Sequence, residues 1–340
     1  MSTDPIISVT PLAFPWQTKD PFLVCVHHVD NYPQGNDKLG PVGSLEGRNL
    51  GQDFAGKDGW RMYHGDQVPG FPQHPHRGFE TVTFVREGYI DHSDSLGATA
   101  RFGRGDVQWL TAGAGIVHSE MFPLLNPDTP NRLELFQIWV NLPASRKFAD
   151  PYFTMFWDKD VPRHRVTDSN GKHVEVTVIA GTLAGVAAPA PPPDSWAANA
   201  DADVAIWAIV LEAGAKWTVP PARDGRVART LYFFSGGKLD VAGRIVAQPV
   251  AIEVVGDQPV PIAAVDGPAE ILVLQGRPIA EPVAQYGPFV MNTRAELEQA
   301  FADYRRTQFG GWPFGDNEPV HPRPRGRFAQ HADGRVEEAV

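Results

Sequence analysis

The chain has 340 residues, of which 42% are hydrophobic, and its formal net charge is −10. This length exceeds one typical domain, and the composition is that of a globular protein. The negative charge argues against direct binding to nucleic acid, and no apolar stretch approaches the roughly 20 residues that a membrane-spanning helix needs. The single cysteine, Cys25, excludes an intramolecular disulfide and a cysteine-based zinc site. The first residues lack the features of a signal peptide, so we expect a cytoplasmic protein.

Short apolar runs separated by turn residues fill the first part of the chain. From residue 79 onward these runs become dense, and they predict strands over residues 81–85, 89–90, 99–102, 107–110 and 133–142. Short strands between closely spaced turns are typical of a small barrel or sandwich. Because Pro143 closes the last run, we place the end of a first domain, residues 1–145, directly after it.

The second half contains a similar series of predicted strands. They cover residues 174–180, 205–211, 229–234, 251–255 and 270–274. Their order echoes the first half, which suggests an internal duplication whose sequence identity has faded. A loop rich in Pro and Ala, residues 185–203, interrupts the series, and we expect it to be an exposed excursion. The sequence therefore predicts an all-β chain with a second domain over residues 146–315.

One helix is predicted near the end of the second domain. Thr293 can cap a helix over residues 294–306, because Glu296 follows three residues after the cap and apolar residues recur at helical spacing. From residue 316 to 340 the chain is polar, with prolines and charges of both signs. We expect this tail to be disordered.

Two pairs of residues carry the strongest chemical signal in the chain. His74 and His76 are separated by one residue, and so are His118 and Glu120, which follow a glycine-rich turn. Side chains two apart on a strand share a face, so two such strands brought together would converge three imidazoles and a carboxylate. These groups suit a divalent transition metal. The alternative is a polar cluster that is satisfied by its own hydrogen bonds.

Other candidate residues have simpler interpretations. His92 and Asp94 form a further spaced pair, but they lie at a predicted turn, where Asp favours hydrogen bonds to its own backbone. The adjacent His27 and His28 would point to opposite faces of a strand, and we expect His64 to be a barrel-wall or loop residue. Cys25 lies in an apolar run typical of a buried small residue. The second half has no histidine near residues 217–221, where a counterpart of the His pair is expected, so we predict one metal per chain.

The segments around these histidines closely resemble the pirin family. The similarity covers residues 60–65, 74–83, 91–97, 105–121 and 281–292, so it spans most of the chain except the tail. It implies a bicupin, two cupin β-barrels in tandem, with one divalent metal in the first barrel. In this family the metal is usually iron, so we expect Fe(II), held by the residues that match His74, His76, His118 and Glu120.

Glu80 requires separate treatment, because a general cupin motif places a metal-binding Glu near this position. Pirins use the later Glu. On an unbroken strand Glu80 would share a face with His74 and His76, although Gly78 disturbs that regularity. The candidate roles are to orient a ligand or bound water, or to make a plain structural hydrogen bond.

The resemblance also implies an activity, since several pirins are flavonol dioxygenases that resemble quercetinases. We therefore expect a small planar aromatic substrate, with dioxygen as the second substrate and carbon monoxide as a product. Glu120 would act as the general base that takes the proton of the flavonol hydroxyl. Four aromatic residues near the ligands could line the substrate pocket or belong to the barrel core: Phe71, Phe79, Phe84 and Trp109.

Two other functions use the same residues. Some pirins are regulators whose iron switches the binding of a partner protein, and such a role would need no turnover. A small-molecule-binding cupin or isomerase could use the metal only as a Lewis acid. Oxygen consumption separates the dioxygenase from both alternatives.

Overall fold

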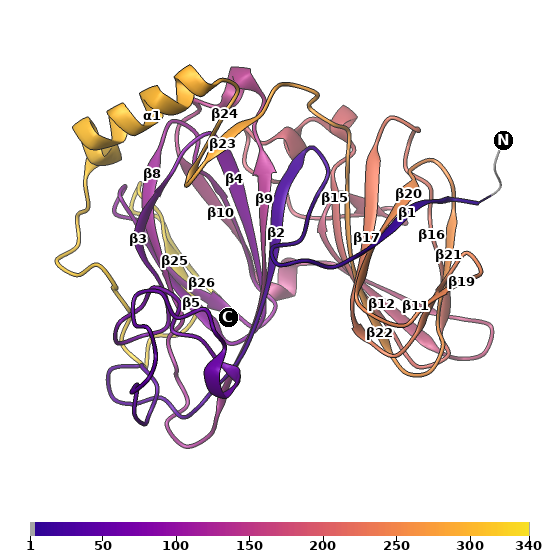
Figure 1. Ribbon diagram of the computed structural model, residues 1–340, viewed down its shortest axis with the longest axis horizontal. Coiled ribbons are helices and arrows are strands. Elements are labelled where there is room, and N and C mark those ends of the chain that lie inside the picture. Colours follow the sequence, from indigo (N-terminus) through magenta and orange to yellow (C-terminus); the bar gives the residue numbers. More distant parts are fainter. Residues whose placement is uncertain (1–3, 340) are drawn as a thin grey trace. The chain divides into compact units, whose positions relative to one another are not determined.

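The computed structural model describes residues 4–339, which divide into two compact units. Unit 1 contains residues 4–26, 139–143 and 159–280, and unit 2 contains residues 27–138, 144–158 and 281–339. Both are built from antiparallel sheets, and the described residues contain one α-helix (Figure 1). This confirms the prediction of an all-β chain with a short C-terminal helix. Among the described residues, no helix has the length and apolar character needed to cross a membrane.

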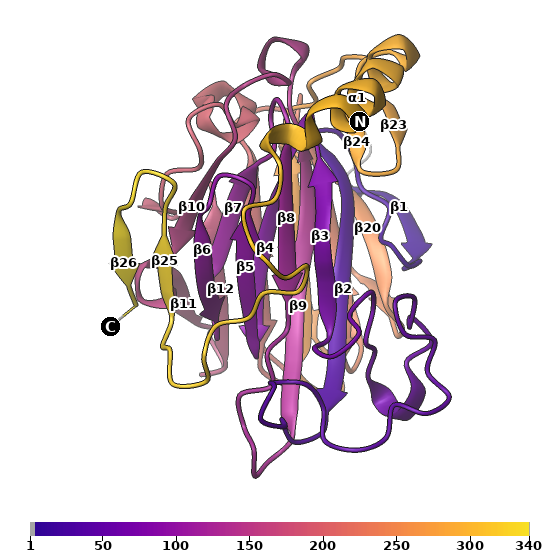
Figure 2. The same ribbon diagram turned by 90° about the vertical axis from the view of Figure 1, so that its left-hand side faces the viewer.

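Unit 2 consists mainly of two sheets that face each other (Figures 1 and 2). The first has the strand order β10 (Tyr152–Phe156), β7 (Val107–Thr111), β4 (Phe79–Glu87), β9 (Asn131–Asn141) and β2 (Phe22–Tyr32). The second has the order β26 (Val336–Glu338), β25 (Phe328–Gln330), β6 (Thr99–Gly103), β5 (Tyr89–Asp94), β8 (Ile116–Met121) and β3 (Gly70–His76). Smaller elements are the hairpin β23 (Ala284–Tyr286) and β24 (Phe289–Met291), and the 3-10 turns η1 (Lys57–Gly59), η2 (Ala144–Arg146) and η6 (Gln308–Gly310).

Unit 1 repeats this architecture with different strands. Its larger sheet has the order β1 (Ile6–Pro11), β20 (Val250–Val255), β17 (Ala228–Gly236), β22 (Ala269–Gly276), β15 (Ala205–Leu211), β12 (His173–Ala180) and β11 (Arg163–Thr167). Its smaller sheet has the order β16 (Lys216–Val219), β21 (Val260–Ala264), β18 (Leu239–Val241) and β19 (Arg244–Val246). The predicted excursion, residues 185–203, contains β14 (Val186–Ala187) and the turns η4 (Trp196–Ala198) and η5 (Ala200–Ala202). Strand β14 pairs with β13 (Thr182–Leu183), which lies just before the excursion, and η3 (Asp158–Asp160) spans the start of the unit's main segment.

Each unit has its own apolar core, formed by residues that alternate with polar ones along the strands. In unit 2, Val85 and Leu110 from one sheet join Phe102 and Ile116 from the other, and all four are buried. In unit 1, Val176, Leu231 and Val273 belong to one buried cluster. Because each unit buries a separate core, neither depends on a metal ion for its hydrophobic stabilisation.

The helix α1 (Arg294–Thr307) begins as the sequence predicts. Thr293 accepts a hydrogen bond from the backbone N–H of Glu296, and the Glu296 side chain accepts one from the backbone N–H of Thr293, so both halves of the capping box are present. Leu297 and Ala300 are the buried residues of its inner face, and they pack in a cluster with Phe289 of β24. The helix is therefore part of unit 2.

The prediction of a disordered tail over residues 316–340 is wrong for the described residues. Strand β25 pairs with β6 and β26 pairs with β25, which extends the second sheet of unit 2. The buried Arg101 explains how a polar segment becomes ordered. Its guanidinium makes two 2.7 Å bonds to Asp91 and also donates to the backbone carbonyls of residues 321, 322 and 325. Composition does not reveal this, because the order comes from a distant arginine.

The two units also differ from the predicted boundaries, 1–145 and 146–315. Residues 4–26 lie in unit 1, where β1 pairs with β20. Strand β10 lies in unit 2, where it pairs with β7, although it follows the expected boundary. The helix α1 was expected in the second domain and lies in unit 2. Sequence order alone does not reveal that these segments lie in the other unit, because strand pairing decides to which unit each segment belongs.

Arg101 provides a test of how the tail is held. Arg101→Met should lower the free energy of unfolding by about 3–5 kcal/mol, because it leaves the carboxylate of Asp91 buried without its charged partner. It should also release the tail, so that trypsin cleaves after Arg325 and Arg327 earlier than in the parent protein. Urea denaturation and mass spectrometry of the digest measure both effects. The exposed Arg104→Met is the control, with an expected change within about 0.5 kcal/mol. Equal trypsin sensitivity in the two variants would contradict this account of the tail.

Candidate metal centre

Three histidines converge where strands β3 and β8 pair. His74 lies directly opposite His118 in the register of the two strands, and a bulge separates His74 from Phe71. The ring centres are 4.5 Å apart for His74 and His118, 4.8 Å for His74 and His76, and 4.9 Å for His76 and His118. One nitrogen from each residue can be chosen so that all three lie within 4.8 Å of one another. A group with this spacing could hold a metal ion.

Glycine at two turns allows these strands to approach the rest of unit 2. Gly78, between β3 and β4, has φ +85°, and a Cβ there would lie 2.0 Å from the carbonyl oxygen of Val290. Gly115, just before β8, has φ +134°, and a Cβ there would lie 2.7 Å from the ring of Phe309. Both positions therefore require glycine for conformational and steric reasons. They fix the ends of the two strands that carry the histidines.

The hydrogen bonds of the histidines suit the binding of a metal through the remaining nitrogens. Nδ1 of His74 lies 2.8 Å from the carbonyl oxygen of Pro72, and Nδ1 of His76 lies 3.4 Å from that of Pro288. A carbonyl can only accept, so each Nδ1 carries the proton and Nε2 keeps its lone pair. His118 is fully buried, and neither ring nitrogen has a hydrogen-bond partner among the described residues. A buried imidazole without partners is costly, and a bound cation would satisfy it.

Burial also keeps these imidazoles neutral. Desolvation lowers the pKa of His74 from 6.5 to about 4, and it holds the pKa values of His76 and His118 well below that ordinary value. Repulsion between the neighbouring imidazolium forms acts in the same direction. Because a metal binds the neutral imidazole, the site is ready for an ion at neutral pH without first losing protons.

Glu120 lies beside the three histidines on the same strand as His118. Its Oε2 is 3.9 Å from Nε2 of His118 and accepts a 2.8 Å hydrogen bond from the side-chain amide of Gln137. The Thr83 hydroxyl lies 3.5 Å from Oε1, which is a long hydrogen bond. Burial raises the pKa of the Glu120 carboxyl, and the bond from Gln137 opposes that rise. The residue can therefore serve as a ligand or exchange a proton nearer to neutral pH than an exposed glutamate.

Two of the four predicted aromatic residues contact the histidines. The ring centre of Phe79 is 5.0 Å from that of His76, and the ring centre of Phe71 is 6.2 Å from that of His74. Phe79 is buried, whereas Phe71 and His74 are partly exposed. The cluster therefore reaches solvent on the side of Phe71 and His74.

The other two aromatic residues and Glu80 lie on the strand faces opposite to that of Thr83. Thr83 on β4 points toward Glu120, so alternation along the strand places Glu80 and Phe84 on its opposite face. Trp109 pairs with Val82 in β7 and shares that opposite face. Glu80 accepts a 2.7 Å hydrogen bond from the Thr111 hydroxyl. Glu80 would share a face with His76 only on an unbroken strand, and Gly78 breaks the strand between them. The sequence shows this glycine but does not reveal which face Glu80 takes.

His92 is a neighbour of the site that the sequence assigned only to a turn. Strand β5 pairs with β8 so that His92 lies opposite Glu120 and Asp94 lies opposite His118. His92 is fully buried, its ring centre is 5.6 Å from that of His118, and its Nε2 lies 3.1 Å from Asp94. Asp94 also accepts bonds from the backbone of the following turn, as expected. The missing information was the register of β5 against β8, which no motif supplies.

The remaining histidines of the first half make other contacts. His27 pairs with Glu134 at 3.0 Å, His28 binds the Tyr63 hydroxyl at 2.8 Å, and His64 binds the carbonyl oxygen of Gly51 at 2.6 Å. Cys25, on β2, is fully buried. These positions agree with the interpretation that none of them joins the His74 group.

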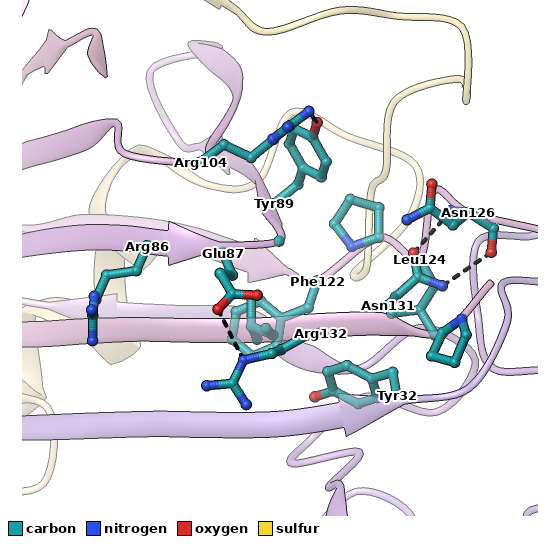
Figure 3. A pocket seen from close by; sticks show the side chains of 14 residues that line it. Tyr32, Arg86, Glu87, Tyr89, Arg104, Phe122, Leu124, Asn126, Asn131 and Arg132 are labelled. Atoms are coloured by element: carbon teal, nitrogen blue, oxygen red, sulfur yellow. Dashed lines mark hydrogen bonds and ion pairs between the residues drawn. The ribbon is translucent and has the colours of Figure 1, made fainter. Parts of the chain in front are cut away.

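A pocket of about 590 Å³ opens elsewhere in unit 2 (Figure 3). Arg132 and Glu87 form an ion pair in it at 3.0 Å, and Tyr32, Tyr89 and Arg104 also line it. Phe122 is part of its wall, and the Phe122 ring centre is 6.0 Å from that of Phe71. The contact between Phe122 and Phe71 therefore lies between this pocket and His74.

Comparisons with known proteins agree with the predicted family. A family model described as pirin matches residues 47–140, and another, the pirin C-terminal cupin domain, matches residues 206–310. The protein named "Putative quercetin 2,3-dioxygenase PA2418" of Pseudomonas aeruginosa is 37% identical over 243 residues, which cover 72% of this chain and 80% of that protein. Human pirin is 33% identical over 254 residues, which cover 73% and 80%.

The fold has counterparts among solved structures. A quercetin 2,3-dioxygenase from Acinetobacter baumannii superposes with a TM-score of 0.71 at 24% identity, over 91% of this chain and 99% of that one. This similarity concerns the fold, and together with the cupin match it confirms the prediction of two tandem cupin barrels.

The low pKa of His74 predicts how the stability of the metal-free protein depends on pH. The unfolded chain binds a proton at His74 near pH 6.5, whereas the folded chain resists it down to about pH 4. Stability from this group is therefore fully present above pH 6.5 and is lost as pH falls toward 4. His74→Gln should reduce the pH slope of the free energy of unfolding between pH 6 and 5 by at most about 1.4 kcal/mol per pH unit. Urea denaturation after treatment with a chelator measures the slope, with the exposed His173→Gln as control. Identical slopes in both variants would contradict the assignment.

Proposed function

The chain belongs to the pirin family, and from this premise we propose that it is a metal-dependent dioxygenase that cleaves a small planar aromatic substrate such as a flavonol. The convergence of His74, His76 and His118 beside Glu120 carries the proposal, because neutral imidazoles with a neighbouring carboxylate suit a redox-active divalent ion. Relatives at 37% and 39% identity bear the name quercetin 2,3-dioxygenase, which supports this class of reaction.

We propose that the ion is Fe(II), held by the three histidines and Glu120. His118 fits this role because neither of its nitrogens has another partner among the described residues. His74 and His76 fit it because carbonyl groups orient their rings through Nδ1. When bound, the ion supplies Lewis acidity, open coordination positions and redox chemistry toward dioxygen.

Glu120 is the proposed general base. A flavonol must lose the proton of its 3-hydroxyl before the ring is oxidised, and Glu120 is the carboxylate beside the histidines that can accept it. In the metal-free protein burial raises the pKa of this carboxyl and the amide of Gln137 opposes that rise, whereas a bound cation would favour the charged form that accepts a proton. Gln137 and Thr83 also hold the carboxylate in place, which limits the reorganisation needed when the proton arrives.

Phe71 and Phe79 are the proposed substrate contacts. Each lies beside a different histidine, so an aromatic ring that reaches the ion would meet an aromatic side chain next to His74 or next to His76. Phe71 is partly exposed, which makes it the residue that a substrate meets first. Phe84 and Trp109, on the opposite face of their strands, are no longer substrate contacts in this proposal.

Oxygen uptake with detection of carbon monoxide tests the reaction directly. Protein loaded anaerobically with Fe(II) is mixed with quercetin and air-saturated buffer, and His118→Ala is the control. The proposal predicts consumption of dioxygen and release of carbon monoxide in equal amounts, both absent in the control. Stoichiometric iron without uptake would reject the dioxygenase and favour the regulatory, partner-binding alternative.

Metal retention should separate the roles of the ligands. His74→Ala and His118→Ala should each lose the metal with little loss of fold, because the apolar core of unit 2 does not include these side chains. Glu120→Gln should keep more metal than either and lose turnover by about 10²-fold or more, since it removes the base. Elemental analysis after gel filtration and circular dichroism measure these effects. Retained turnover in Glu120→Gln would reject Glu120 as the base.

Gln137 gives a separate test through pH. Its hydrogen bond favours the charged form of Glu120, so Gln137→Leu should raise the pKa of that carboxyl further. A base works only when deprotonated, so the acidic limb of kcat/KM should move to higher pH by roughly 1 unit. The exposed Gln299→Leu on α1 is the control. An unchanged acidic limb in Gln137→Leu would show that another group controls it.

A further inference from the structure

Unit 1 contains a pocket of about 550 Å³ that the proposed reaction does not use. It lies where β15 begins and β22 ends, beneath the segment of residues 181–204. Much of its wall is apolar, from alanines and prolines of that segment together with Leu183 and Val204. Polar side chains also line it: Thr182, Asn199, Asp203, Arg223, Trp207, Arg229 and Gln275. The last three of these lie on strands of the larger sheet.

Strand register brings these polar residues to one face. Arg229 of β17 lies opposite Gln275 of β22, and Gln275 lies opposite Ala205 of β15. Trp207 follows two residues after Ala205, so its side chain shares that face. Ala205 and Trp207 belong to the core cluster of unit 1, which shows that this is the inner face. The three polar groups therefore close the inner end of the pocket above the apolar core.

Arg229 is a buried cation whose hydrogen-bond acceptors are all uncharged. Only 1% of its surface is exposed. Nε and Nη2 donate to the side-chain oxygen of Gln275, and Nη1 donates to the carbonyl oxygen of Pro220. Burial lowers its pKa to about 10, so it remains charged at neutral pH. A guanidinium has five N–H groups, and these contacts use only three of them.

The acidic residue nearest to Arg229 is engaged elsewhere. Asp203 also lines the pocket and attracts Arg229 electrostatically, but no ion pair joins the two among the described residues. Its carboxylate accepts a 3.0 Å hydrogen bond from the backbone N–H of Arg223 and lies 3.8 Å from the Arg223 side chain. The charge of Arg229 therefore lacks a direct counterion, which is unusual for a buried guanidinium.

Trp207 provides a second, independent observation. The residue is 3% exposed, and its indole N–H has no hydrogen-bond partner among the described residues. A buried indole N–H normally finds an acceptor. Here an unpaired neutral donor and a cation with unused donors line the same pocket. An acceptor would satisfy the indole, and an acceptor with negative charge would also supply the counterion of the guanidinium.

We propose that this pocket of unit 1 binds a small carboxylate with an apolar body. The carboxylate would accept hydrogen bonds from the unused N–H groups of Arg229 and from the indole of Trp207, while the apolar wall would cover the rest of the ligand. Gln275 fixes the guanidinium from the other side, and its own amide donates to the carbonyl oxygen of Asp203 at 2.9 Å. This site is separate from the histidine cluster and does not rest on the proposed dioxygenase activity.

Calorimetric titration of the full chain with sodium benzoate tests the proposal, with ionic strength held constant by sodium chloride. We expect saturable binding of one benzoate per chain. Benzamide, which has the same shape without the charge, should bind at least about tenfold more weakly, since charge-assisted bonds to arginine are lost. Arg229→Gln should weaken benzoate binding by a similar factor, and Trp207→Phe should weaken it by less.

Two matched variants locate the binding. Arg226→Gln removes an exposed arginine three residues from Arg229 and should leave the affinity unchanged. His118→Ala should also leave it unchanged, because the histidine cluster is not part of this pocket. If Arg229→Gln does not fold, the comparison of benzoate with benzamide and the affinity of Trp207→Phe still test the proposed carboxylate site. Absence of saturable benzoate binding, equal affinity for benzamide, or loss of binding in His118→Ala would each overturn the proposal.

Discussion

The pairing of β3 with β8 is the constraint on which the candidate centre depends. It places His74 opposite His118, and a shift of one residue would turn one of these imidazoles to the other face of the sheet. Glycine is required at positions 78 and 115, next to these strands, because any side chain there would collide with Val290 or Phe309. Burial then keeps the imidazoles neutral and raises the pKa of Glu120. The register and the desolvation together create a group of ligands that is ready for a cation.

The parts of this arrangement that follow local rules could be predicted from the sequence. Alternation on strands predicted that His74 would share a face with His76, and the capping box of Thr293 and Glu296 predicted the start of α1. Features that depend on distant pairing could not be predicted. Glu80 follows Gly78, whose positive φ breaks the parity, and the place of His92 beside Glu120 depends on the register of β5 with β8. The tail is ordered by Arg101, more than 200 residues before it in the sequence.

The two units use the same kind of sheet to bury different polar groups. Unit 2 buries neutral imidazoles that suit a cation, and neither nitrogen of His118 has a hydrogen-bond partner among the described residues. Unit 1 buries a guanidinium and an indole N–H whose unused donors suit an anion. In both places buried polar groups lack complete sets of partners, and such groups are costly in a protein interior. The two inner faces therefore indicate ligands of opposite charge. The absence of histidine near residues 217–221 agrees with this difference.

The position of the metal is the most direct test of the account. A crystal structure of the Fe(II)-loaded protein, with anomalous diffraction recorded on both sides of the iron absorption edge, would locate the ion. The account predicts one anomalous peak per chain, in contact with Nε2 of His74, a nitrogen of His118, His76 and the carboxylate of Glu120. A peak bound instead by His92 and Asp94, or an iron-loaded crystal without a peak between β3 and β8, would contradict it.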